Sequence, residues 1–146
     1  MDNYVIRSPK TKLEWELYYQ FRWEQLREPW GMSKDSSLDS FEENSSHLFG
    51  WTSSHKVIAS GRIHTISKTQ AQIRYMAVEE SFKRKGIGSK IVQELELIAL
   101  ELGLVEVVLN ARENALEFYE SLGYIAGDPY LSDTGIPHKR MKKELK

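Results

Sequence analysis

The chain has 146 residues, of which 40% are hydrophobic and 28% are charged, and its net charge is −1. These values are ordinary for a globular chain that folds as one domain over residues 1–146, and the near-neutral charge argues against a nucleic-acid partner. The chain has no cysteine, which excludes disulfide bonds, thiolate catalysis and cysteine-based zinc sites, and we expect no metal site. It shows neither an apolar signal segment nor a run of membrane-spanning length, so we expect a cytoplasmic protein with no membrane partner.

The first third of the chain is predicted to form a strand, a helix and a polar connection. Strand formers favour a short strand at Tyr4–Arg7, and Thr11–Glu14 has the pattern of a capping box that starts a helix. Pro29 ends or bends this helix. We expect Arg22 to point into water and residues 33–46 to form a mobile connection. Apolar residues at helical spacing are predicted to be mostly core: Leu13, Trp15, Leu17, Tyr18 and Phe21.

Two strands and a turn are predicted in the middle of the chain. Residues 47–51 and 57–66 are typical of a hairpin joined around 52–56. Gly61 inside the second strand indicates a bulge or a close backbone approach. A further strand is predicted over residues 71–78, which are rich in strand formers.

A basic turn with two glycines follows this strand. Three cations, Lys83–Lys85, precede Gly86–Ser89, and helical periodicity then runs from Ile87 to a stop at Gly103. The glycines therefore lie at a helix start, where free N–H groups and the helix dipole favour an anion such as phosphate. Neither the third glycine of a dinucleotide fingerprint nor the Gly-Lys-Ser/Thr of a Walker loop is present. By itself the turn fits a phosphate site and an ordinary solvated turn equally well.

The last third of the chain is predicted to contain two strands and a short helix. Residues 104–109 form an apolar run that is typical of a buried strand. Asn114 is expected to cap a helix over residues 115–122 through a capping box. Residues 136–145 are predicted to form a final strand, which Pro137 would confine to an edge or a bulge.

The order of elements from Ala71 to Tyr124 resembles the GNAT acyltransferase family. The shared features are a strand, an xxGxG turn, a long helix, a strand followed by Asn, and a short helix carrying FYESLGY. Lys83 departs from the Gln or Arg that is usual at its position. The resemblance implies a mixed α/β fold with a central twisted, mainly antiparallel sheet flanked by helices. In that fold the strand ending at Val78 diverges from the strand at 105–109.

The resemblance also implies acyl-CoA, expected as acetyl-CoA, as the co-substrate, bound where these strands diverge. Backbone near Val78 would hold the pantetheine, and the glycine turn would hold the pyrophosphate. The implied cofactor-binding residues are Met76, Ala77, Val78, Lys83, Arg84, Lys85, Gly86, Ile87, Gly88, Ser89, Asn110, Asn114, Phe118 and Tyr119.

The implied reaction is acyl transfer to a primary amine by direct attack. Tyr119 matches the family acid that protonates the thiolate, and Glu79 is a candidate general base whose alternative is a solvated carboxylate. The acceptor, a small-molecule or peptide amine, is expected between the N-terminal helix region and the C-terminal segment. Its expected contacts are Arg27, Trp30, Arg74 and His138.

The sequence leaves two alternatives to catalysis open. One is a non-catalytic acyl-CoA-binding or regulatory domain of the same fold, and the other is an interaction module whose aromatic residues bind a peptide. The identity of the acceptor and the formation of a homodimer are also open.

Overall fold

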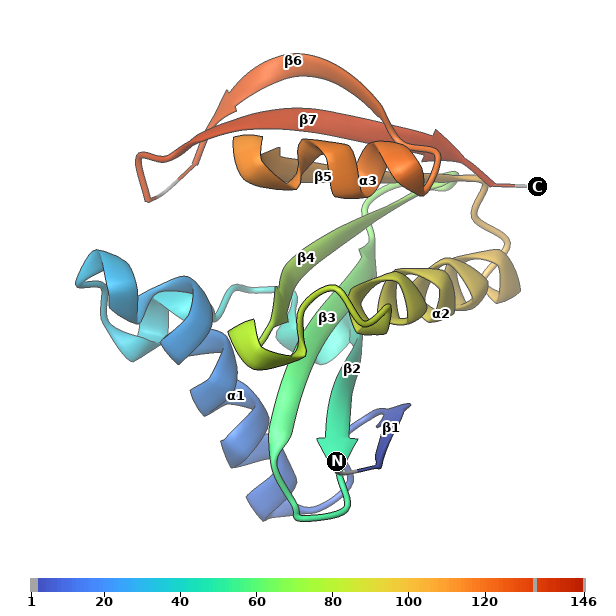
Figure 1. Ribbon diagram of the computed structural model, residues 1–146. Helices are drawn as coiled ribbons and strands as arrows, with labels where there is room; N and C mark the ends of the chain where they lie inside the picture. The colour runs from blue at the N-terminus through green and yellow to red at the C-terminus, as the bar shows by residue number, and fades with distance from the viewer. Residues whose placement is uncertain (1–2, 133, 146) are drawn as a thin grey trace.

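A seven-stranded sheet in the order β1-β2-β3-β4-β5-β7-β6 forms the centre of the computed structural model, which describes residues 3–132 and 134–145 (Figure 1). The strands are β1 (Tyr4–Arg7), β2 (Ser45–Thr52), β3 (Val57–Thr65), β4 (Gln70–Val78), β5 (Glu106–Arg112), β6 (Ile125–Leu131) and β7 (Pro137–Glu144). The helices are α1 (Lys12–Leu26), α2 (Ile87–Glu101) and α3 (Leu116–Ser121). Short 3-10 turns lie at η1 (Glu28–Trp30), η2 (Lys34–Ser37), η3 (Glu42–Asn44), η4 (Glu80–Phe82) and η5 (Glu113–Ala115). The predicted mixed α/β fold with a mainly antiparallel sheet is confirmed.

The sheet divides between β4 and β5, which form a parallel pair. Residues 70–72 pair with residues 106–108, and beyond these pairs the two strands diverge (Figure 1). The other neighbouring strands pair in antiparallel fashion. Where strands separate, the backbone groups along their facing edges are open to hydrogen bonds with an extended ligand.

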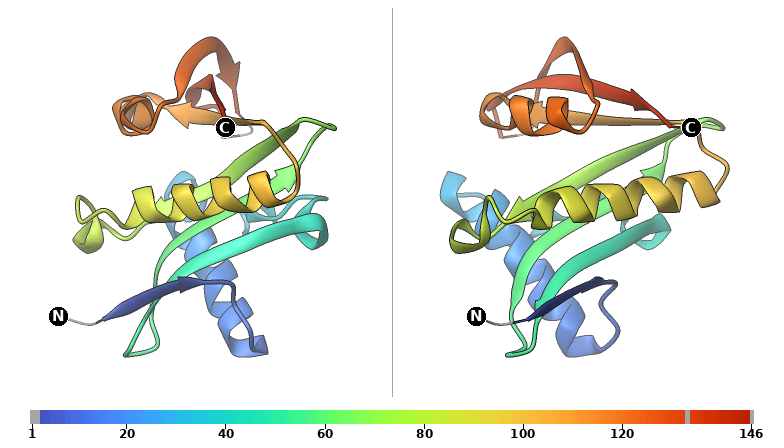
Figure 2. Two further views of the ribbon diagram at one scale, coloured as in Figure 1. Left: turned by 90° about the vertical axis from the view of Figure 1, so that its right-hand side faces the viewer. Right: turned by 45° about the vertical axis from the view of Figure 1, so that its right-hand side comes forward.

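Helices α2 and α3 lie on one side of the sheet, while α1 packs on the other side of its N-terminal half (Figure 2). The core under α2 and α3 is mainly aliphatic, with Ile63, Ile73, Ile91, Leu95, Val107, Leu109 and Met141 buried together. A second cluster under α1 contains Tyr18, Phe21, Phe49 and Val57. The two clusters fix α1 and α2 against opposite faces of the same strands.

Gly61 shows both features that its place in a strand predicts. The register between β3 and β4 shifts between Ser60 and Arg62. A Cβ at Gly61 would lie 2.6 Å from Ile91 and 2.7 Å from the Met76 sulfur, so only glycine lets α2 pack this closely.

The predicted start of α1 and the predicted start and end of α2 are confirmed. The Thr11 hydroxyl accepts a hydrogen bond from the Glu14 N–H, at 3.1 Å, at the start of α1. Helix α2 begins at Ile87, and Gly103 lies just beyond it with a left-handed φ of 81°. The hairpin of β2 and β3 is also confirmed.

Several predictions about side chains and element boundaries were wrong. Leu13 is 61% exposed because it lies on the side of α1 that faces away from the sheet. Asn114 does not cap α3, which begins after Ala115 with no side-chain cap, because η5 precedes it. Strand β5 extends to Arg112, so Asn110 lies within it.

The C-terminal strands also differ from the prediction. Strand β6 was missed, because its largely exposed residues show no alternation. It forms the edge, and β7 lies between β5 and β6, so the expectation that Pro137 confines β7 to an edge or a bulge was wrong: the register shift of this hairpin lies between Ala126 and Pro129 in β6. Pro137 is tolerated as the first residue of β7.

Candidate functional site

A cleft of about 910 Å³ opens where β4 and β5 diverge. Its walls come from β4, the turn before α2, β5, α3, the β6–β7 hairpin and the end of α1. Most of the residues predicted for cofactor binding line it: Met76, Ala77, Val78, Lys83, Arg84, Gly86, Ile87, Gly88, Ser89, Asn110, Asn114, Phe118 and Tyr119. Lys85 does not, and its ammonium lies 5.5 Å from the centre of the Phe82 ring.

The glycine turn forms an open cradle at one end of the cleft. Gly86 is the N-cap of α2 and has a left-handed φ of 83°. A Cβ at Gly88 would lie 3.2 Å from the Phe118 ring and 3.5 Å from Val78, so a side chain there would fill the approach to the backbone. The first N–H groups of a helix have no partner within it, and Lys83 and Arg84 add positive charge beside them. This donor set fits a pyrophosphate.

The adjoining part of β4 has an irregular backbone. Tyr75 has a left-handed φ of 58°, at the level of the register shift between β3 and β4. The Ser60 hydroxyl donates to the Tyr75 carbonyl oxygen, at 2.8 Å, and stabilises this conformation. Across the cleft, the Asn110 side-chain oxygen is buried without a hydrogen-bond partner in the described part of the chain. A polar ligand group could satisfy it.

Tyr119 lies on α3 with 7% of its surface exposed, and it lines the cleft. Its ring packs edge-on against Phe118 and Tyr124. Burial raises the pKa of Tyr119 well above the ordinary value for a phenol, and burial is the sole cause. The hydroxyl is therefore protonated at neutral pH and can act as a proton donor.

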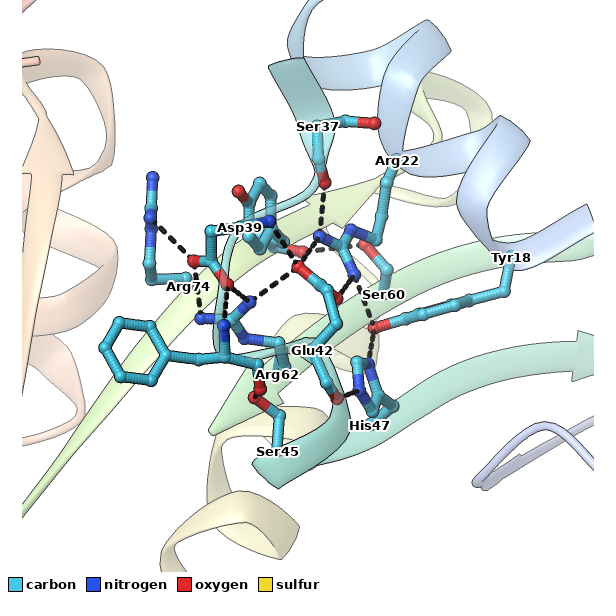
Figure 3. A network of polar contacts seen from close by, with 12 residues as sticks. Tyr18, Arg22, Ser37, Asp39, Glu42, Ser45, His47, Ser60, Arg62 and Arg74 are labelled. Carbon is cyan, nitrogen blue, oxygen red and sulfur yellow. Dashed lines mark hydrogen bonds and ion pairs between the residues drawn. The ribbon is translucent and has the colours of Figure 1, made fainter. Parts of the chain in front are cut away.

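Behind β4 lies a buried polar cluster, which we call the arginine network: Tyr18, Arg22, Ser37, Asp39, Glu42, His47, Arg62 and Arg74 (Figure 3). Arg22 and Arg62 are completely buried, and both pair with Glu42 at 2.8 Å. Asp39 pairs with Arg62 at 2.6 Å and with Arg74 at 2.9 Å. The prediction that Arg22 points into water was therefore wrong.

The same network corrects the view of residues 33–46 as a mobile connection. Asp39 and Glu42 tie this segment to strands β3 and β4, and the His47 Nε2–H donates to the Glu42 carbonyl oxygen, at 2.8 Å. Burial alone would raise the pKa of Asp39, but hydrogen bonds from Arg62 and the neighbouring charges hold it well below its usual range. Asp39 is therefore ionised at neutral pH.

The structure brings three of the four predicted acceptor contacts to the cleft: Arg27, Arg74 and His138. Trp30 is 51% exposed and does not line it, although its ring centre lies 6.0 Å from the Arg112 guanidinium. Glu79 also lies outside the lining. Its carboxylate pairs with Lys56 at 2.8 Å and accepts from the Ser81 hydroxyl at 3.1 Å.

Arg112, Tyr130 and Arg140 also line the cleft and were not predicted. Arg112 and Tyr130 lie on strand segments that the sequence did not reveal, because β5 was predicted to end at residue 109 and β6 was missed. Arg140 lies in β7, whose strand was predicted, but no pattern in the sequence indicated that it faces the cleft. Alternation along β5 beyond Asn110 is the one signal that could have indicated Arg112.

Comparison with known proteins agrees with this geometry. A model for the acetyltransferase (GNAT) domain matches residues 21–145. An uncharacterised N-acetyltransferase of Bacillus subtilis, YjcF, is 28% identical over 111 residues, which cover 75% of this chain and 78% of that protein. Among solved structures, a GNAT-family acetyltransferase from Staphylococcus aureus has a TM-score of 0.80 at 12% identity, with 99% of this chain and 100% of that chain covered. An aminoglycoside 6′-N-acetyltransferase complexed with coenzyme A has a TM-score of 0.79 at 15% identity, with 97% of each chain covered.

The chain therefore belongs to the GNAT acetyltransferase family. It is an N-acetyltransferase by enzyme class, which decides against the peptide-binding alternative. No helix over residues 3–132 and 134–145 is long and apolar enough to cross a membrane.

Proposed function

We propose that this enzyme transfers an acetyl group from acetyl-CoA to a primary amine by direct attack. One observation carries the proposal: the glycine cradle and the buried phenol of Tyr119 lie in the same cleft, at the divergence of β4 and β5. The solved neighbour complexed with coenzyme A supports the choice of co-substrate. Acetyl-CoA would supply an activated thioester carbonyl.

The residues that would hold the co-substrate follow from the lining of the cleft. The N–H groups at the start of α2, together with Lys83 and Arg84, would bind the pyrophosphate. The free edge of β4 from Met76 to Val78 would bind the pantetheine amides. A backbone N–H near Val78 would stabilise the negative charge that develops on the thioester oxygen during attack.

Two protons must move in this reaction. The amine loses one proton, and the departing thiolate gains one, which we assign to the Tyr119 hydroxyl. For the first proton we assign His138 in place of Glu79. The His138 Nδ1–H donates to the Ile136 carbonyl oxygen, at 2.6 Å, which leaves Nε2 with a free lone pair in a residue that lines the cleft. The Glu79 carboxylate is instead held by Lys56.

Turnover with a panel of primary amines tests the proposal, with free thiol as the readout and calorimetric titration of CoA as the binding measurement. CoA should bind with an affinity better than millimolar, and acetyl-CoA should be consumed only when an amine is present. A folded protein that fails to bind CoA at millimolar concentration would refute the co-substrate assignment. Comparing His138→Gln with Glu79→Gln tests the base: we expect the first to lower kcat and shift the pH–rate profile, and the second to leave both unchanged.

A further inference from the structure

We infer that the acceptor of this enzyme carries an anionic group, a carboxylate or a phosphate, close to the amine that is acetylated. The inference rests on the proposed function and names its substrate class. It concerns the part of the cleft away from the glycine turn, which we call the acceptor end and define as Arg74, Arg112, Tyr130, His138 and Arg140.

The charged residues that line the cleft, among those the structure describes, are all basic. The chain contains 21 acidic residues, yet none of the described residues that line the cleft is an aspartate or a glutamate. The lining includes Arg74, Arg112 and Arg140 at the acceptor end, in addition to Lys83 and Arg84 at the glycine turn. A cleft lined by charges of one sign attracts ligands of the opposite sign and disfavours polycations.

Arg112 and Arg140 lie on the face of β5 and β7 that is opposite to helix α3. In the register of β5 and β7, Arg112 lies opposite His138 and Arg140 lies opposite Asn110, so all four residues project from one face of the sheet. The alternate residues, such as Leu109 and Ala111, are buried in the core with Tyr119 of α3. Figure 2 shows α3 on one side of β5 and β7. The acceptor end is therefore separate from the turn at the start of α2.

Arg112 and Arg140 lack an anionic partner within the part of the chain that the structure describes. Arg112 is partly buried, and its guanidinium lies 6.0 Å from the centre of the Trp30 ring. Burial lowers the pKa of Arg112, with no carboxylate to oppose the shift. Arg140 faces the ring of Tyr130 at 5.9 Å. A partly desolvated guanidinium without a counter-ion, such as that of Arg112, is unfavourable, and an anionic ligand would reduce that cost. Arg140 is exposed and contributes its charge alone.

Arg74 adds a positive charge that its own network does not cancel. The arginine network contains three guanidinium groups, of Arg22, Arg62 and Arg74, against the two carboxylates of Asp39 and Glu42. Arg22 and Arg62 have fully buried side chains, whereas the Arg74 side chain is 31% exposed and lines the cleft. The surplus positive charge of the network is therefore presented at the acceptor end.

Matched pairs of amines test the inference. Phosphoethanolamine is compared with ethanolamine for the phosphate arm, and phenylalanine with phenylalaninamide for the carboxylate arm. We expect kcat/KM for the anionic member of at least one pair to exceed that for its neutral partner by about 10- to 100-fold, as charge-assisted hydrogen bonds predict. The pair that shows the preference identifies the anion. A preference for the neutral members, or for spermidine over both, would overturn the inference and leave the proposed function intact.

Variants of Arg112 and Arg140 test whether these residues cause the preference for anionic amines. In Arg112→Gln and Arg140→Gln the ratio of kcat/KM for anionic and neutral partners should fall by about tenfold, since each change removes one charged donor. Arg7→Gln is the matched control, because Arg7 pairs with Glu14 outside the cleft and should leave the ratio unchanged. An unchanged ratio in both cleft variants would contradict the assignment of these residues.

A binding measurement decides the case in which no amine of the panel is acetylated. When CoA is saturating, its pyrophosphate occupies the glycine turn. Added inorganic phosphate can then bind only at the acceptor end, and its effect on the melting temperature measures binding there. Phosphate should raise the melting temperature of the CoA-loaded protein and should do so less in the double variant Arg112→Gln, Arg140→Gln. Equal effects of phosphate in both proteins, or none in either, would reject the anion site. Failure to bind CoA at all would instead reject the proposed function.

Discussion

Tyr119 owes its assigned role to its surroundings as well as its chemistry. It packs between Phe118 and Tyr124, and it meets the cleft from a short helix whose apolar side faces the core. The same burial that orients the phenol also raises its pKa. The hydroxyl is therefore present as an acid when a thiolate forms, and it is a poor base at neutral pH.

Tyr119→Phe keeps the ring and removes only this proton. We expect turnover to fall by about 10- to 1000-fold while CoA affinity stays within a few fold of wild type, because only the transition state uses the hydroxyl. Single-turnover kinetics and calorimetry measure the two quantities. Tyr124→Phe is the control, because its hydroxyl donates to Glu96 at 2.8 Å, away from the reaction, and should leave turnover unchanged. Full turnover in Tyr119→Phe would show that another group protonates the thiolate.

Gly88 permits a test of the cradle. Its backbone φ is not left-handed, so valine is conformationally allowed, but the added Cβ would crowd Phe118 at 3.2 Å. We expect Gly88→Val to weaken CoA binding by at least about tenfold, or ~1.4 kcal/mol, measured by calorimetry. Gly127→Val, where the Cβ would meet only a carbonyl oxygen at 3.5 Å, should bind CoA as wild type does. Unchanged affinity in a folded Gly88→Val protein would place the pyrophosphate elsewhere.

At the scale of elements, residues 34–44 hold β4 in position through ion pairs. Through Asp39 and Glu42 this segment forms ion pairs with guanidinium groups that come from α1, β3 and β4. The Arg22 guanidinium also lies 3.7 Å from the centre of the Tyr75 ring, at the irregular part of β4. The network therefore links the N-terminal helix to the strand that borders the cleft.

Removing the Glu42 carboxylate should show how much the arginine network contributes to the stability of the fold. Glu42→Gln leaves Arg22 and Arg62 buried with less compensation, and we expect the free energy of unfolding to fall by about 2–4 kcal/mol in a denaturant titration. Glu43→Gln changes the same residue type at the next, exposed position and should fall within ~0.5 kcal/mol of wild type. Equal stability of the two variants would mean that the network contributes little to the fold.

The elements that the sequence predicted well are those with local causes. The start of α1 follows from a cap three residues away, and the turn before α2 follows from adjacent glycines and cations. The network could not be predicted in this way, because Asp39 and Arg62 are 23 positions apart and only tertiary folding joins them. A polar stretch such as 33–46 has the same composition whether its charges meet water or buried arginines. Strand β6 was missed for a related reason, since an edge strand with exposed residues carries no hydrophobic alternation.

At the scale of the whole molecule, the buried charges make stability depend on pH. His64 lies in β3 beside the network, stacked on Phe41 at 4.4 Å, and its Nδ1 accepts from Arg62 at 3.1 Å. Burial and the neighbouring Arg62 charge lower the pKa of His64 from its usual 6.5 to about 4, against the opposing charges of Asp39 and Glu42. Burial, chiefly, also lowers the pKa of His47. Both histidines are therefore neutral in the folded protein near neutral pH.

This difference predicts the direction of acid destabilisation. Between pH 6.5 and pH 4 the unfolded chain takes up a proton at His64 that the folded protein does not, so the free energy of unfolding falls as the pH is lowered. For one proton, the slope of the free energy of unfolding against pH is at most ~1.4 kcal/mol per pH unit, and solvent screening makes the slope smaller. His64→Asn keeps an acceptor for Arg62 but cannot be protonated, so its stability should decline less steeply over this range. His55→Asn, in the exposed turn between β2 and β3, should keep the wild-type slope. Denaturant titrations at several pH values measure these slopes, and a slope for His64→Asn equal to that of wild type would show that protonation at β3 does not limit acid stability.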